Sequence, residues 1–326
     1  MFKVTQKICS STQLKESLPI SQTLAEKKQC FDDQIKDNFL SKDRFVVVVG
    51  PCSADDPVAV QQYCLKLKRL ADKVASKILV VARIYTAKPH SDGDGYLGLA
   101  FHENDVELPN LNKGLYRCRQ MMLSCLDVGL PIADELLFCQ HYDYFDDLVS
   151  YWFLGARSST DTYHRSFASG LNTVVGVKNA VDGNLLQTVQ SLYAISRPKV
   201  FLQGDSQVET DGNQLVHAVL RGYSVNDKMF ANFDDQTVSK CKSYVKQFGL
   251  NPFIMVDVSH ANSNKVANNQ IKNALAVVKN KDVNGLMLES YLFGGCKTNA
   301  FGVSKTDDCI SFKETEQLIL QLFEAM

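Results

Sequence analysis

Three residues of metal-binding types each follow an apolar run of the sequence. Cys52 follows VVVVGP, His260 follows IMVDVS and Glu289 follows GLML, while Asp307 or Asp308 in the tail segment KTDDC offers a fourth ligand. Thiolate, imidazole and carboxylate together form a donor set of mixed softness, which accepts Mn²⁺, Fe²⁺, Co²⁺ or Zn²⁺. A single cysteine or histidine at such a position is more often only a buried residue. Their joint placement predicts a divalent-metal site.

Five cations also lie at or just after the ends of apolar runs: Arg83, Lys88, Arg157, Lys178 and Arg221. One basic residue in such a place is commonly a solvated surface charge. Five together would repel one another strongly unless a multiply anionic ligand lies among them. Arginine forks suit carboxylate and phosphate oxygens, so these residues predict a small ligand that carries both groups.

The elements that position these residues alternate along the chain. Apolar runs predict strands over 45–49, 78–84, 130–133, 151–156, 173–178, 199–202, 215–220, 252–256 and 284–288. Helical spacing of apolar residues predicts helices over 21–39, 58–74, 115–128, 231–248, 269–278 and 313–325. Repeated strand–helix units form a parallel sheet with helical crossovers, and eight such units close into a (β/α)8 TIM barrel. The carboxyl ends of its strands converge on one face, where ligands bind.

Two features flank this α/β repeat. The runs 199–202 and 215–220 are joined by a short polar segment without a helical pattern, which predicts an extra strand or hairpin beside the barrel. Residues 1–44 are mostly polar, so we expect an N-terminal extension over 1–44 and a catalytic barrel over 45–326. The continuous valines of VVVVG predict a strand buried on both faces. We expect Gly50 to permit a bend and Pro51 to stop the ladder, which places Cys52 just past the strand end.

Composition excludes several classes of protein. The chain has 326 residues, of which 45% are hydrophobic, and a net charge of -1. These values suit one large α/β domain and give no sign of a nucleic-acid partner. Neither an apolar leader nor a run of about 18 apolar residues is present, so we expect no membrane span. Ten scattered cysteines without a CxxC pair predict mostly buried free thiols in a reducing compartment, and hence a cytoplasmic protein.

A set of motifs in order along the chain identifies a resemblance. They are GPCS (50–53), RIYTAKP (83–89), GLP (129–131), GAR (155–157), VGVKN (175–179), LRG (220–222), DVSHANSNK (257–265), LES (288–290) and TDDCI (306–310). With them the chain resembles the type I 3-deoxy-D-arabino-heptulosonate 7-phosphate (DAHP) synthases. The resemblance implies a (β/α)8 barrel that condenses phosphoenolpyruvate (PEP) with erythrose 4-phosphate in the first step of the shikimate pathway. It also implies a divalent metal such as manganese, and a homodimer or homotetramer.

The resemblance further implies roles for individual residues. The metal ligands would be Cys52, His260, Glu289 and Asp307, and the match of the tail favours Asp307 over Asp308. Arg83 and Lys88 would bind PEP near its carboxylate, while Arg157, Lys178 and Arg221 would hold its phosphate. Lys88 is the candidate proton donor to the new alkoxide, because we expect the surrounding cations to lower its pKa. Glu135 would assist the addition of water at C2 of PEP, and Asp307 would also contact an aldehyde hydroxyl.

The sequence departs from the family pattern at the aldehyde end of the site. The family usually has Lys-Pro-Arg-Thr, where the arginine binds the aldehyde phosphate, but this chain reads KPHSDGDGYLG with His90 in that place. His90, Ser91 and Asp307 are then the candidate aldehyde-binding residues. A histidine is mostly neutral at pH 7, and Asp92 and Asp94 would repel a phosphate. The alternative is therefore a synthase for a different aldehyde, including an unphosphorylated one.

A second alternative is a non-catalytic regulatory barrel. Such a protein would be free to lose a metal ligand or a cation, whereas this chain retains all four ligands and all five cations. The segment between residues 202 and 215 is shorter than in family members that bind an aromatic amino acid for feedback. We therefore make no prediction about a feedback effector.

Overall fold

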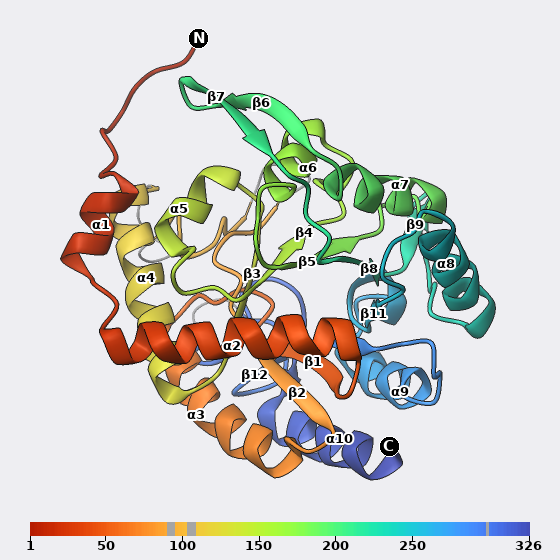
Figure 1. Ribbon diagram of the computed structural model, residues 1–326. Coiled ribbons are helices and arrows are strands. Elements are labelled where there is room, and N and C mark those ends of the chain that lie inside the picture. The colour runs from red at the N-terminus through yellow and green to blue at the C-terminus, as the bar shows by residue number, and fades with distance from the viewer. Residues whose placement is uncertain (90–94, 103–108, 298–299) are drawn as a thin grey trace.

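Eight parallel strands close into a barrel in the computed structural model, which describes residues 1–89, 95–102, 109–297 and 300–326 (Figure 1). The strands are β1 (Phe45–Gly50), β2 (Ile78–Arg83), β3 (Ile132–Glu135), β4 (Tyr151–Leu154), β5 (Val174–Lys178), β8 (Val216–Leu220), β11 (Ile254–Asp257) and β12 (Gly285–Tyr291). The barrel closes where β12 pairs with β1, from Val46 opposite Gly285 to Gly50 opposite Glu289. The predicted (β/α)8 TIM barrel is confirmed.

Helices connect the barrel strands and cover the outside of the barrel (Figure 1). They are α3 (Pro57–Val74), α4 (Leu111–Val128), α5 (Tyr142–Phe145), α6 (Thr162–Ala168), α7 (Leu185–Ile195), α8 (Asp235–Gln247), α9 (Ala267–Val277) and α10 (Phe312–Ala325), with single turns η1 (Cys139–His141) and η2 (His260–Ser263). Side-chain N-caps place the first residues of two helices away from the predicted boundaries. Asn110 accepts a hydrogen bond from the Lys113 amide, and Asp234 accepts one from the Thr237 amide, so α4 and α8 begin there.

The predicted extra hairpin is present. Strands β6 (Lys199–Gln203) and β7 (Ser206–Thr210) pair antiparallel outside the barrel, so the polar segment after residue 202 contains a strand of its own. A second hairpin, β9 (Tyr223–Val225) with β10 (Lys228–Phe230), was not predicted. Its turn residues Asn226 and Asp227 have φ of 47° and 60°, the left-handed values of a two-residue hairpin turn. A short strand β13 (Ile310–Ser311) pairs with β12 and brings the tail to the barrel mouth.

The N-terminal helices are α1 (Ser11–Ser17) and α2 (Gln22–Ser41), and α2 runs across one end of the barrel (Figure 1). Its Ile35 and Phe39 join the cluster of side chains inside the barrel. The Phe39 ring lies 5.4 Å from that of Phe253 and 6.2 Å from that of His217, between ring centroids. Phe253 directly precedes β11, and His217 lies near the start of β8. Helix α2 therefore closes the end of the barrel opposite to the strands' carboxyl ends.

Strand β1 shows why its valines form an unbroken run. Val46 and Val48 belong to the cluster inside the barrel, whereas Val47 and Val49 belong to the cluster between the barrel and its helices. Successive side chains of a barrel strand point to opposite faces, and here both faces are buried. The prediction of a strand buried on both sides is confirmed.

The expected role of Gly50 is wrong. Gly50 does not make a bend, because it is the last residue of β1 and pairs with Glu289. A Cβ at this position would lie 2.2 Å from the backbone oxygen of Arg83. Glycine is therefore needed for the close approach of the two neighbouring strands at the end where Cys52 follows.

Two further predictions concern the whole chain. All ten cysteines are free thiols, and seven of them are buried, as expected. Within the described ranges, none of the helices combines the length and the apolar character that crossing a membrane requires.

Candidate active site

The donor atoms of Cys52, Glu289 and Asp307 all lie within 4.8 Å of one another at the carboxyl ends of the strands. Cys52 follows β1, Glu289 belongs to β12, and β13 brings Asp307 to the same place. His260 approaches from η2, with its Nε2 3.9 Å from Oε1 of Glu289. The structure thus gathers three of the four residues predicted as metal ligands into one donor group, with the fourth, His260, beside Glu289. Asp308 is not part of this group, so the geometry favours Asp307 over its neighbour.

The imidazole of His260 is held from one side. Its Nδ1 lies 2.7 Å from Oγ of Ser259 and 2.9 Å from Oδ2 of Asp257, which leaves Nε2 facing Glu289. The backbone of His260 has φ of 51°, a left-handed value that non-glycine residues rarely adopt and that clusters at functional sites. Histidines that bind metals usually hold a carboxylate with the other ring nitrogen. This donor set therefore fits a divalent metal ion.

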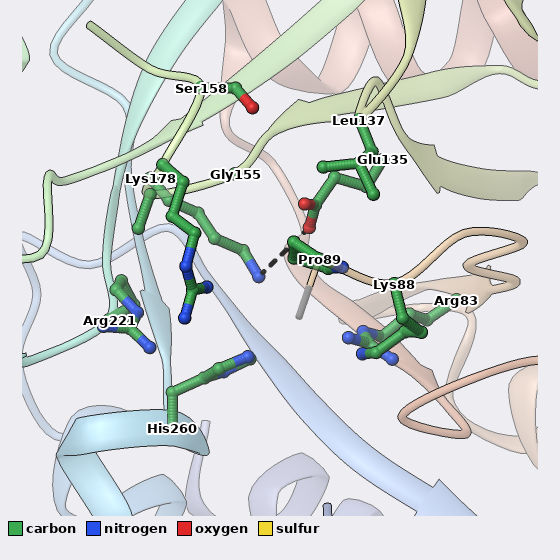
Figure 2. A pocket seen from close by; sticks show the side chains of 12 residues that line it. Arg83, Lys88, Pro89, Glu135, Leu137, Gly155, Ser158, Lys178, Arg221 and His260 are labelled. Carbon is green, nitrogen blue, oxygen red and sulfur yellow. Dashed lines mark ion pairs between the residues drawn. The ribbon is translucent and has the colours of Figure 1, made fainter. Parts of the chain in front are cut away.

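The five predicted cations line one pocket at the same end of the barrel. Figure 2 labels four of them, Arg83, Lys88, Lys178 and Arg221, around the pocket with Glu135 and His260. The lining residues that carry charge are Arg83, Lys88, Glu135, Arg157, Lys178, Arg221 and His260. Arg221 is mostly buried. Burial lowers its pKa, and the neighbouring charge of Arg157 lowers it further. Two arginines that disfavour each other's charge are suited to an anion between them.

Arg83 and Lys88 lie between the pocket and the donor group of Cys52, Glu289 and Asp307. Arg83 donates hydrogen bonds to the carbonyl oxygens of Pro51 and Cys52 and, at 2.9 Å, to Oε1 of Glu289. Lys88 donates to the Cys52 carbonyl oxygen at 2.9 Å and approaches the Cys52 sulfur at 3.0 Å. These contacts join the anion pocket to the donor group through two charged side chains.

The expected lowering of the Lys88 pKa is wrong. Burial does act to lower it, as does the charge of Arg83, but the Cys52 sulfur and Glu289 favour the ammonium form. The net result is a pKa of Lys88 above its usual value. The sequence indicates that cations surround Lys88. The groups that outweigh their effect on its pKa, Cys52 and Glu289, come from other parts of the barrel.

Lys178 connects the pocket to two carboxylates. Its Nζ lies 3.2 Å from Oδ2 of Asp257 and 3.9 Å from Oε2 of Glu135 (Figure 2 marks an ion pair of Lys178). In its present position Glu135 uses the space left by glycine at residue 155, since a Cβ on Gly155 would lie 2.3 Å from Oε1 of Glu135. The predicted catalytic carboxylate therefore lies in the anion pocket, beside a cation that faces the same space.

Sequence reasoning gave no role to three residues that the structure places in the site. Asp257 contacts both Lys178 and His260, Lys265 lies 3.3 Å from Oδ1 of Asp307, and Tyr85 lies under Arg83. Tyr85 belongs to the motif RIYTAKP, and Asp257 and Lys265 belong to DVSHANSNK. Their position in these motifs was the signal in the sequence that could have identified them as site residues. The candidate aldehyde residues His90 and Ser91 lie outside the described residues.

With this geometry in view, comparisons with known proteins give a consistent result. A sequence model of the DAHP synthetase I family matches residues 32–319. The chain belongs to the DAHP synthetase I family. Members of this family are carbon–carbon bond-forming enzymes, which agrees with the resemblance found from the motifs.

Curated members of the DAHP synthetase I family align over almost the whole chain. The Tyr-sensitive phospho-2-dehydro-3-deoxyheptonate aldolase of Escherichia coli is 34% identical, over 98% of this chain and 93% of that protein. The Phe-sensitive enzyme of the same organism is also 34% identical, over 93% of this chain and 89% of that protein. The solved structure of the aldolase from Francisella tularensis aligns with a TM-score of 0.92 at 32% identity, over 100% of this chain and 98% of that one.

Proposed function

We propose that this protein condenses PEP with erythrose 4-phosphate to give DAHP and inorganic phosphate, the first step of the shikimate pathway. One observation carries the proposal: five cations line a pocket that lies directly beside a cluster of thiol, imidazole and carboxylate donors. The pocket suits a small ligand with a carboxylate and a phosphate, as PEP has. Family membership supports the same reaction, since the relatives are named for the aldolase activity.

The proposed metal ligands are Cys52, His260, Glu289 and Asp307, which form a donor set for Mn²⁺, Fe²⁺, Co²⁺ or Zn²⁺. A bound divalent ion would supply Lewis acidity toward the aldehyde carbonyl. The protein's part is to hold the donors at fixed positions. Asp257 and Ser259 orient the imidazole of His260, while Arg83 fixes one oxygen of Glu289.

For PEP we propose that Arg83 and Lys88 lie at the carboxylate end. Arg157, Lys178 and Arg221 then hold the phosphate. This orientation places the carboxylate of PEP toward Cys52 and Glu289, the partners of Arg83 and Lys88, and so places its reactive carbons near the donor cluster. Holding both reactants in one pocket removes much of the entropic cost of their encounter.

The proposed chemistry forms one carbon–carbon bond. The methylene carbon of PEP attacks the aldehyde carbon, and the carbonyl oxygen becomes an alkoxide that takes a proton from Nζ of Lys88. With its pKa above the usual value, Lys88 carries that proton at neutral pH. Asp307 contacts an aldehyde hydroxyl in this proposal, which makes it both a ligand and a substrate contact.

The second half of the reaction releases phosphate. Water adds to C2 of PEP, and Glu135 accepts a proton from that water in the pocket where it lies beside Lys178. The bond between C2 and the phosphate oxygen then breaks, the C2 hydroxyl gives its proton to the departing phosphate, and C2 becomes a keto group. Arg157 and Arg221 stabilise the charge on the departing phosphate, because both are cations that line the pocket.

A second candidate differs only in the aldehyde. His90 occupies the place of the arginine that binds the aldehyde phosphate in the family, and Asp92 and Asp94 follow it. This observation favours a synthase for a different aldehyde, including an unphosphorylated one, with His90, Ser91 and Asp307 as the aldehyde-binding residues. The PEP and metal residues have the same roles in both candidates.

The test is release of inorganic phosphate from PEP in the presence of Mn²⁺, with erythrose 4-phosphate, erythrose and a panel of other aldehydes. Turnover with erythrose 4-phosphate supports the first candidate, and turnover with another aldehyde alone supports the second. No turnover with any aldehyde, together with a lack of stoichiometric metal, would instead favour a non-catalytic regulatory barrel.

Two proposals concern the whole molecule. We propose that it is a homodimer or homotetramer, as the family resemblance implies. We also propose that residues 1–44, with α1 and α2, form an extension to a catalytic barrel over 45–326. Sedimentation of the purified chain tests the first, and the stability of a chain that begins at residue 45 tests the second.

A further inference from the structure

Tyr85 lies within reach of two pocket cations that come from different strands. The centre of the Arg83 guanidinium is 3.8 Å from the centroid of the Tyr85 ring, and Nζ of Lys178 is 5.4 Å from it. Arg83 ends β2 and Lys178 ends β5, which are not neighbours in the barrel. Both distances are within the range in which a cation is attracted to an aromatic face.

The ring of Tyr85 makes these contacts and its hydroxyl does not. Tyr85 is 1% exposed, and among the described residues its hydroxyl has a single hydrogen-bond partner, the thioether sulfur of Met287 at 3.7 Å. A buried phenol commonly has a stronger partner than a thioether. Burial also raises the pKa of Tyr85, so the side chain is neutral at ordinary pH.

A neutral ring holds cations in a different way from a carboxylate. Glu289 and Asp257 also hold Arg83 and Lys178, but each carboxylate cancels positive charge that the pocket needs for an anion. The quadrupole of the ring attracts both cations without changing the net charge of the site. The ring can therefore keep two like charges close together before a ligand binds.

We propose that Tyr85 is a positioning residue for PEP, whose aromatic ring holds Arg83 and Lys178 in the geometry that binds the anion without neutralising them. The inference rests on the proposed function, since it takes PEP as the ligand of these cations. It assigns to the ring a share of PEP affinity and no part in the chemistry.

Two substitutions separate the ring from the hydroxyl. Tyr85→Phe keeps the ring, whereas Tyr85→Leu keeps an apolar side chain without a ring. The matched control is Phe253→Leu, which removes another buried ring inside the barrel; Phe253 packs on Phe39 and His217, with no cation–π contact found among the described residues. Binding of PEP to each full-length variant with Mn²⁺ and no aldehyde is measured by isothermal titration calorimetry.

We expect Tyr85→Phe to bind PEP within about twofold of the wild type, and Tyr85→Leu to bind about tenfold more weakly. In the phosphate-release assay, Tyr85→Leu should raise KM for PEP with kcat changed less than threefold. The control should lower the melting temperature and leave PEP affinity unchanged. If Tyr85→Leu does not fold, Tyr85→Met is the replacement, with the same expected result.

Wild-type affinity in the folded Leu or Met variant would overturn the inference and leave the proposed function in place. Equal losses in Tyr85→Phe and Tyr85→Leu would also overturn it, because the hydroxyl would then be responsible. If the wild type itself does not bind PEP, the proposed function fails, and the inference fails with it.

Discussion

The carboxylate of Asp257 lies 2.9 Å from Nδ1 of His260, and the same oxygen lies 3.2 Å from Nζ of Lys178. Asp257 is fully buried, and the charges of His260 and Lys178 outweigh its burial, so that its pKa lies well below the usual value. One ionised carboxylate therefore connects the donor cluster with the anion pocket, and it holds an imidazole on one side and an ammonium on the other.

Asp257→Asn should weaken metal binding, because an amide fixes the orientation and the tautomer of His260 less well than a carboxylate does. We expect a loss of about 10- to 100-fold in Mn²⁺ affinity. Titration of the metal-free protein with Mn²⁺, followed by electron paramagnetic resonance, measures this directly. Asp282→Asn, which changes an ion pair with Lys242 away from the site, is the control. Equal Mn²⁺ affinity in Asp257→Asn and in this control would contradict the role given to Asp257.

Cys52→Ala should abolish stoichiometric metal binding and phosphate release, since the thiol is one of the converging donors. Asp308→Asn is the matched control: it changes a carboxylate next to Asp307 that is not part of the donor group, and we expect it to retain both properties. Elemental analysis measures the metal content of the two purified variants. Full metal content in Cys52→Ala would show that the cysteine is only a buried residue.

His90→Arg should lower KM for erythrose 4-phosphate if that sugar is the substrate, because an arginine adds a charge-assisted hydrogen bond to its phosphate. We expect a change of about tenfold, with KM for PEP unchanged as the internal control. Steady-state phosphate release at saturating PEP gives both constants. An unchanged KM for erythrose 4-phosphate would mean that the histidine is not what distinguishes this chain from its family.

Stability should fall as the pH falls from about 6.5 to 4, in part through His217. Burial lowers the pKa of this histidine to about 4, so the unfolded state binds a proton more readily than the folded state in this range. The contribution of the neutral imidazole to the free energy of unfolding is fully present above pH 6.5. About 3 kcal/mol of that free energy is lost as the pH falls to 4.

Urea unfolding at pH 7.0, 5.5 and 4.5 checks this pH dependence. His217→Gln should flatten it, although some slope should persist through His141, whose pKa burial also lowers to about 4. The double variant His141→Gln/His217→Gln should be flatter still. If the slope of His217→Gln equals that of the wild type, His217 does not contribute to the acid sensitivity.

Much of the site was predictable because of a simple property of parallel strands. Their carboxyl ends meet at one edge, so reactive residues that end apolar runs must lie near one another in a barrel. Cys52, Lys178 and Glu289 were placed in this way, and the structure brings them to the same end of the barrel. The helices α6 and α7 were not predicted, since the first has only seven residues and the second exposes the large hydrophobic residues Leu186 and Tyr193.

The sequence by itself determined the fold class, the end of the barrel that carries the site, and the residue types available there. The tertiary structure decided which partners those residues have. It set Asp257 between His260 and Lys178, gave Lys88 anionic neighbours that raise its pKa, and set Tyr85 under two cations. The physical reason is that periodicity records which face of an element is buried, whereas electrostatic contacts arise between strands that are distant along the chain.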